Sequence, residues 1–121
     1  MMPLVDGHLH LFKPHSEQYP RRVYDVMAEE SREELAAELV RAMEANGVSH
    51  AVVVPLGNGD EYLREVIAAY PGRFAGVGLY DHESPQDVSV VRERCVSGPL
   101  QGLRFYGLNG RMGDRPTELA C

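Results

Sequence analysis

Short apolar runs alternate along this chain with segments of helical periodicity, and this alternation constrains the fold more than any other feature. Four runs have the length and composition of strands: residues 4–12, 51–54, 74–80 and 100–106. The run at 51–54, Ala-Val-Val-Val, is typical of a strand buried in a parallel sheet. Strands that alternate with helices indicate βα units, so we expect an α/β fold with right-handed crossovers between parallel strands.

Three helices are predicted between these strands from their start and stop signals. The first begins with Ser31 and Glu34, which have the spacing of a capping box. The third begins with Ser84 as the cap and Pro85 in the first helical position. The apolar stripes and stop signals are Leu35, Leu39 and Met43 before Asn46-Gly47; Leu63, Val66, Ile67 and Tyr70 before Pro71-Gly72; and Val88, Val91 and Cys95 before Gly98-Pro99.

The number of elements fits two architectures. One is a small open sheet with a flavodoxin-like arrangement, and the other is the first half of a (β/α)₈ barrel, which needs around 250 residues when complete. In either case we expect a single domain over residues 1–121. Half a barrel would expose two parallel sheet edges and one sheet face. For that architecture we therefore expect the chain to be a fragment of a longer one, or one partner of a homo-oligomer.

Charge and composition narrow the range of partners. Twelve Lys and Arg against eighteen Asp and Glu give a net charge of −6, with no basic cluster, which argues against nucleic acid or an anionic membrane as a partner. The longest apolar run, residues 51–56, is far shorter than the roughly 20 residues of a membrane span, and the first residues do not resemble a signal peptide. We therefore expect a cytoplasmic protein in which Cys95 and Cys121 are thiols.

The first strand has an unusual polar face. Strand alternation places Asp6, His8 and His10 on one face and the apolar residues 5, 9 and 11 on the other. Two imidazoles at this spacing can share one metal ion, and Asp6 can orient a ring by accepting its second N–H. A catalytic zinc usually takes three protein ligands and a water, so further ligands must come from elsewhere in the fold. The alternative is a pair of half-buried histidines that only form hydrogen bonds.

These residues resemble the opening of the amidohydrolase superfamily, in which a first strand of the form Val-Asp-x-His-x-His binds a divalent metal through its two histidines. Blocks at residues 45–55, 62–77 and 100–105 are similar in order and spacing to the amidohydrolase 2 branch, which includes hydrolases of the 2-pyrone-4,6-dicarboxylate lactonase type and related decarboxylases. The resemblance implies a partial TIM (β/α)₈ barrel, with its first four parallel strands and three connecting helices.

Carried over residue by residue, the resemblance implies that His8 and His10 are metal ligands for a divalent ion, with zinc favoured and manganese as the alternative. Arg104 matches the arginine of the fourth strand and is expected to bind a substrate carboxylate. The other reading of Arg104 is an ion pair with Asp6 or Asp81. The family's catalytic aspartate, on its eighth strand, has no counterpart here, so no catalytic residue is assigned.

The remaining candidates are expected to have smaller roles. His50 is expected before the second strand, at the end of the sheet opposite the site, in a surface or capping role. His15 and His82 are expected in loops on the site's side, where solvated histidines are common. The turn at residues 57–59, Gly-Asn-Gly, lacks the lysine and spacing of a P-loop and is interpreted as an ordinary βα turn.

The resemblance implies a metal-dependent hydrolase that acts on a lactone or a related small carboxylated substrate, and we expect the isolated 121-residue piece to be inactive. Two alternatives stay open: a metal-dependent decarboxylase of the same superfamily, and a non-catalytic α/β domain that binds a small ligand or a protein. The expected partners are a small-molecule substrate and either the missing C-terminal half or a further copy of the chain.

Overall fold

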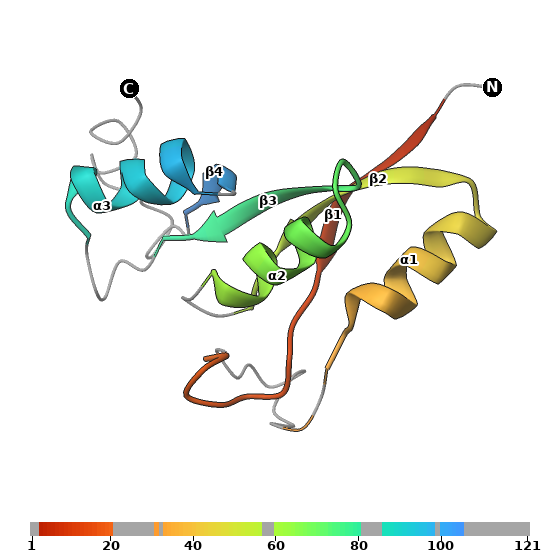
Figure 1. Cartoon of the computed structure of the whole chain (residues 1–121), viewed down its shortest axis with the longest axis horizontal. Coiled ribbons are helices and arrows are strands. Elements are labelled where there is room, and N and C mark those ends of the chain that lie inside the picture. The colour runs from red at the N-terminus through yellow and green to blue at the C-terminus, as the bar shows by residue number, and fades with distance from the viewer. Residues whose placement is uncertain are drawn as a thin grey trace.

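The computed structural model describes residues 3–20, 31, 33–56, 60–80, 86–98 and 100–105. These residues form one sheet of four parallel strands: β1 (Leu4–His10), β2 (Val48–Val54), β3 (Phe74–Leu79) and β4 (Leu100–Arg104). The strands lie in the order β1-β2-β3-β4, as Figure 1 shows. The expected parallel α/β sheet is therefore confirmed.

Helices connect the strands (Figure 1). They are α1 (Ala36–Ala45), α2 (Glu61–Ala69) and α3 (Val88–Arg92), and a π-helical turn at Glu93–Ser97 continues α3. The sequential strand order differs from a flavodoxin-like sheet, whose order reverses at a switch point. The flavodoxin-like alternative is therefore wrong for these four strands, and the order agrees with consecutive strands of a barrel. In the part of the chain that the structure describes, no helix has the length and apolar composition to cross a membrane.

The hydrophobic core lies between the sheet and the first two helices. Its most buried members are Val53 in β2 and Leu63 in α2, both with no exposed surface, and Met43 of α1 packs in the same cluster. The predicted stripe of α2 is confirmed, since Val66 is buried and Ile67 packs against the cluster. The stripe of α1 is shifted from the prediction: its buried residues are Ala36, Val40 and Met43, whereas Leu39 is only partly buried.

The predicted capping box at the start of α1 is wrong. The helix begins at Ala36, and its N-cap is Leu35, which has an extended backbone and makes no side-chain cap bond. Glu34 instead exchanges two main-chain hydrogen bonds with Phe12, at 3.1 and 2.9 Å. The Ala36 N–H donates to the hydroxyl of Tyr62 in α2, 3.0 Å away. A tertiary contact therefore supplies the acceptor that the sequence assigned to Ser31.

The other boundaries follow the sequence more closely. Gly47 and Gly72 have positive φ values of 70° and 75°, which confirms the two predicted stops after α1 and α2. The third helix begins later than predicted, at Val88, because Asp87 is extended and forms its N-cap. Several predictions fall on residues outside the described ranges: the 57–59 turn, Asp81, His82, the Ser84-Pro85 cap, Pro99, Tyr106 and Cys121.

Candidate metal site at the end of the first strand

A β-bulge in β1 determines which residues face the candidate site. Asp6 is in register with Ala51 and Leu9 with Val53, so β1 has one more residue than β2 over this stretch. Val5 and Leu9 consequently lie on opposite faces of the sheet: Val5 is 59% exposed, and Leu9 packs against the core. The prediction of one regular polar face from Asp6 to His10 is therefore wrong, because the extra residue reverses the alternation within the strand.

His10 and Arg104 share the face of the sheet opposite the core. His10 is in register with Val54, which is next to the core residue Val53 on β2. Arg104 lies in β4, at the other end of the strand order, and is in register with Leu79. Val52 lies on the same face of β2 as Val54, and it pairs with Ala75 of β3. Alternate residues along β3 lead from Ala75 to Leu79, so Arg104 projects to the same face of the sheet as His10. Both predicted site residues end their strands, where parallel α/β sheets place their ligand sites.

The imidazoles of His8 and His10 face each other through their Nε2 atoms, which are 3.3 Å apart. The ring planes are nearly perpendicular, at 89°, with centroids 4.9 Å apart. His8 is exposed and His10 is half-buried. Two neutral rings in this arrangement can share one hydrogen bond, and the same two atoms can also bind one cation.

The orientation of His10 is set by the backbone of β2. Its Nδ1 lies 3.1 Å from the carbonyl oxygen of Val54, and a nitrogen in contact with a carbonyl must carry the proton and donate. Nε2 of His10 is then the acceptor nitrogen, with its lone pair directed at His8. Histidine ligands of metals commonly have this second hydrogen bond to a carbonyl or a carboxylate.

Asp6 does not supply that bond. Its Oδ1 accepts the main-chain N–H of His8, 3.0 Å away, so the carboxylate fixes the backbone at the bulge rather than an imidazole ring. The sequence reasoning expected a carboxylate to orient a ring, and the structure places the Val54 carbonyl in that position for His10. The β2 backbone could not have been identified from the sequence motif alone.

The two nitrogens fit a shared metal ion. Two imidazoles bound to one tetrahedral zinc at about 2.0–2.1 Å would have their nitrogens about 3.3 Å apart, which matches the observed Nε2 separation. In the described residues no group of three or more His, Cys, Asp or Glu side chains is placed to hold a metal. The chain therefore presents two ligand atoms with suitable geometry, and these are fewer than a closed zinc site needs.

Burial and positive charge act on His10 together. Burial lowers the pKa of His10, the hydrogen bond to Val54 opposes this, and the charges of His8 and Arg104 lower it further. The guanidinium of Arg104 therefore acts electrostatically on His10 across the sheet. The backbone carbonyl of Arg104 also accepts the N–H of Tyr80, which ties the ends of β3 and β4 together at this side.

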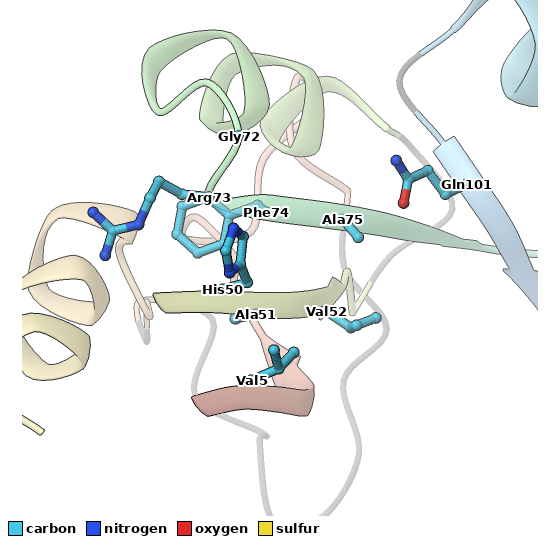
Figure 2. Close-up of a pocket in the computed structure, with 9 residues that line it drawn as sticks. All are labelled: Val5, His50, Ala51, Val52, Gly72, Arg73, Phe74, Ala75 and Gln101. Atoms are coloured by element: carbon cyan, nitrogen blue, oxygen red, sulfur yellow. The ribbon is translucent and has the colours of Figure 1, made fainter. Parts of the chain in front are cut away.

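The other predicted histidines lie away from this pair. His50 is inside β2, because the strand begins at Val48 and not after His50 as expected. It lines an open depression of 230 Å³ near the N-terminal ends of the strands, together with residues from all four of them (Figure 2). Its Nδ1 is 2.7 Å from the hydroxyl of Ser49. His15 is exposed in the loop that follows β1.

Sequence reasoning missed a buried ion pair on the helix side of the sheet. Arg94 donates to both carboxylate oxygens of Asp60, at 2.7 and 2.8 Å, and to the carbonyl of Leu79, at 3.0 Å. Both charged side chains are less than a tenth exposed. One sequence feature could have indicated that Arg94 is buried: it follows Val91 by three residues and so lies on the apolar stripe of the third helix. The pair fixes the end of β3 to the start of α2.

A second missed cluster holds the loop after β1. The Tyr19 hydroxyl donates to Glu65 of α2 at 2.6 Å, and the Tyr19 ring lies edge-on to Tyr62. The ammonium of Lys13 lies 5.8 and 5.4 Å from the centres of these two rings, within the range of cation–π attraction. The loop that leaves the candidate site is therefore anchored to α2.

Comparison with known proteins identifies the fold. No family model matches the sequence, and no curated protein matches it. Among solved structures, the chain is similar to a probable 2-pyrone-4,6-dicarboxylic acid hydrolase from Acinetobacter baumannii with citric acid bound. The TM-score is 0.63 at 22% sequence identity, and the match covers 91% of this chain and 39% of that chain. The chain thus spans about two fifths of that protein, and the expected α/β fold of a partial barrel is confirmed.

Proposed function

We propose that this chain carries the first four strands of a metal-dependent hydrolase that acts on a lactone or a related small carboxylated molecule. His8 and His10 would be the metal ligands. The observation that carries the proposal is the pair of Nε2 atoms 3.3 Å apart at the end of β1. The fold of the structural neighbour supports it, because that protein is described as a probable hydrolase and resembles this chain over nearly all of its length.

The chain's own residues would contribute binding and orientation. A bound divalent ion would activate a water and polarise a carbonyl group. The Val54 carbonyl holds the His10 ring with its Nε2 lone pair available. Arg104 places a positive charge on the same face of the sheet, suited to a substrate carboxylate. The neighbour's name and its bound citric acid both point to carboxylates in that protein, which supports a carboxylated substrate here.

Completing the metal site and moving protons during hydrolysis both need groups other than His8 and His10. Since the described residues hold no third ligand, we infer that further ligands and the carboxylate that moves protons lie outside them. Zinc remains the metal we favour and manganese the alternative, because imidazole suits zinc and carboxylate-rich sites admit manganese.

Zinc binding tests the proposal directly. We expect isothermal titration and elemental analysis to detect zinc bound by the wild-type chain, and His8→Ala and His10→Ala each to weaken it by about tenfold or more. His50→Ala is the matched control, because His50 lies toward the other end of the sheet and should leave zinc affinity unchanged. Equal affinity in all four proteins would contradict the assignment of the ligands.

The reaction class has its own test. In a zinc-loaded protein that is active on a carboxylated lactone, we expect a ring-opened acid as the product. Arg104→Ala should raise the substrate concentration needed for half-maximal rate while zinc remains bound. Release of CO₂ in place of ring opening would indicate a decarboxylase and would contradict the hydrolase proposal.

A further inference from the structure

A buried arginine reaches the end of β3 from the helix side of the sheet. Arg94 lies in the π-helical turn at Glu93–Ser97, and such turns are frequent at functional sites. Its side chain is 9% exposed and donates to both carboxylate oxygens of Asp60. A Cβ added at Gly78 would lie 2.7 Å from Arg94 Nη2 and 3.1 Å from Asp60 Oδ1. The ion pair therefore packs directly against the backbone of β3.

The same guanidinium holds a backbone group of the strand. Nη2 of Arg94 donates to the carbonyl oxygen of Leu79, 3.0 Å away, and Nη1 donates to the side-chain oxygen of Gln86 at 3.2 Å. Together with the two bonds to Asp60, these contacts restrict the planar guanidinium to one orientation. Arg94 thus fixes the position of the Leu79 carbonyl relative to the start of α2.

The end of β3 in turn holds the end of β4. Leu79 is in register with Arg104, and the N–H of the next residue, Tyr80, donates to the Arg104 carbonyl at 3.0 Å. The rings of Tyr80 and Phe105 stack beside this bond, with their centroids 5.1 Å apart. The backbone of Arg104 is therefore held by the segment of β3 that Arg94 fixes.

We propose that Arg94 is a positioning residue for Arg104. The two side chains lie on opposite faces of the sheet, so Arg94 acts through the backbone: first through the Leu79 carbonyl, then through the bond from Tyr80 to Arg104. A displaced strand end moves the guanidinium of Arg104, and binding groups lose much of their effect when they are misplaced. This inference rests on the proposed function, in which Arg104 binds a substrate carboxylate.

Citrate binding by the full chain tests this inference, with citrate as the probe because the structural neighbour holds citric acid. Arg94→Lys keeps the positive charge, but one ammonium cannot hold the Asp60 carboxylate and the Leu79 carbonyl in the fork geometry of a guanidinium. We expect Arg94→Lys to weaken citrate binding several-fold in isothermal titration. Arg104→Ala removes the binding group itself and should weaken it by about tenfold or more.

Amide hydrogen exchange measures the backbone link without a ligand. In Arg94→Lys we expect the Tyr80 amide to exchange several-fold faster relative to the Ala51 amide, which donates to the Arg73 carbonyl at the start of β3. Arg73→Lys is the matched control, because Arg73 also donates to a strand carbonyl, that of Ser49 at 2.9 Å, and to a carboxylate. It should leave citrate affinity and the exchange rate of the Tyr80 amide unchanged.

The outcomes separate this inference from the proposed function. Wild-type citrate affinity and an unchanged ratio of amide rates in Arg94→Lys overturn the inference, as do equal effects of Arg94→Lys and Arg73→Lys. Gln86→Ala leaves the ion pair in place and should change both readouts in the same direction by less, so the test does not depend on the folding of Arg94→Lys. Citrate binding that is absent, or that Arg104→Ala leaves unchanged, counts against the proposed carboxylate site, and the amide ratio then decides whether Arg94 fixes the Arg104 backbone.

Discussion

Two histidines that are close in sequence have different environments in this structure. His10 is half-buried, is held by the Val54 carbonyl and has a lowered pKa, first because of burial and then because of the charges of His8 and Arg104. His8 is exposed and contacts His10 through Nε2. A metal binds only a neutral imidazole, so His10 would release fewer protons on binding a metal than a solvated histidine would at the same pH. The protein environment thus favours the neutral form of one candidate ligand.

Gly78 is a residue at which even one added carbon is costly. A Cβ there would lie 2.6 Å from Leu100 Cδ1 and 2.7 Å from Arg94 Nη2, behind the sheet. We expect Gly78→Ala to destabilise the chain by about 2 kcal/mol in urea unfolding, because the buried ion pair must shift. Gly102→Ala on β4 is the control: its nearest neighbour would be Val77 at 3.7 Å, and the change should be under about 0.5 kcal/mol. Equal losses would show that the β3 site has room to relax.

Cys95 offers a test based on pH. Burial raises the pKa of the Cys95 thiol, and the nearby Arg94 only partly offsets this. In a Cys121→Ser background we expect iodoacetamide to react several-fold more slowly with the native chain at pH 8 than with the urea-unfolded chain. The difference should narrow as the pH rises above the ordinary thiol value of 9.0, since the unfolded thiol is then already ionised. A ratio that does not change with pH would indicate steric protection alone.

At the scale of elements, the ion pair between Asp60 and Arg94 joins α2, β3 and the π-helical turn. Asp60→Ala would leave the Arg94 guanidinium buried without its carboxylate, and we expect a loss of about 3–5 kcal/mol in unfolding free energy. The adjacent Glu61 is the control, because its 3.7 Å contact with Arg64 is exposed and should contribute at most about 0.5 kcal/mol. A small effect of Asp60→Ala would mean that water reaches Arg94.

The start of α1 depends on a hydroxyl from another helix. Tyr62→Phe keeps the ring but removes the oxygen that accepts the Ala36 N–H, and we expect a loss of about 1 kcal/mol in unfolding free energy. Tyr70→Phe is the control at the end of the same helix, where the ring packs edge-on against Phe74. Comparable losses in both variants would place the effect in ring packing rather than in the helix start.

These contacts explain which parts of the fold were predictable. Strand and helix types followed from local periodicity, and the glycine stops followed from the preference of glycine for positive φ. The start of α1 did not, because its acceptor comes from Tyr62, 26 residues away along the chain. His8 and His10 were found as a local motif, whereas the bulge, the Val54 carbonyl and the Asp60–Arg94 pair arise only when separate strands and helices meet.

At the scale of the whole molecule, the described helices pack their apolar residues against one face of the four-stranded sheet. The helices bury the core on one side, and the candidate ligands lie at the strand ends on the other side. The structural neighbour continues well beyond the matched region, since the match covers 39% of its chain. In the described residues two imidazoles converge at the candidate metal site, without a third His, Cys, Asp or Glu side chain placed beside them to hold a metal. The sheet thus positions the candidate pair, and a complete metal centre would need ligands from outside the described residues.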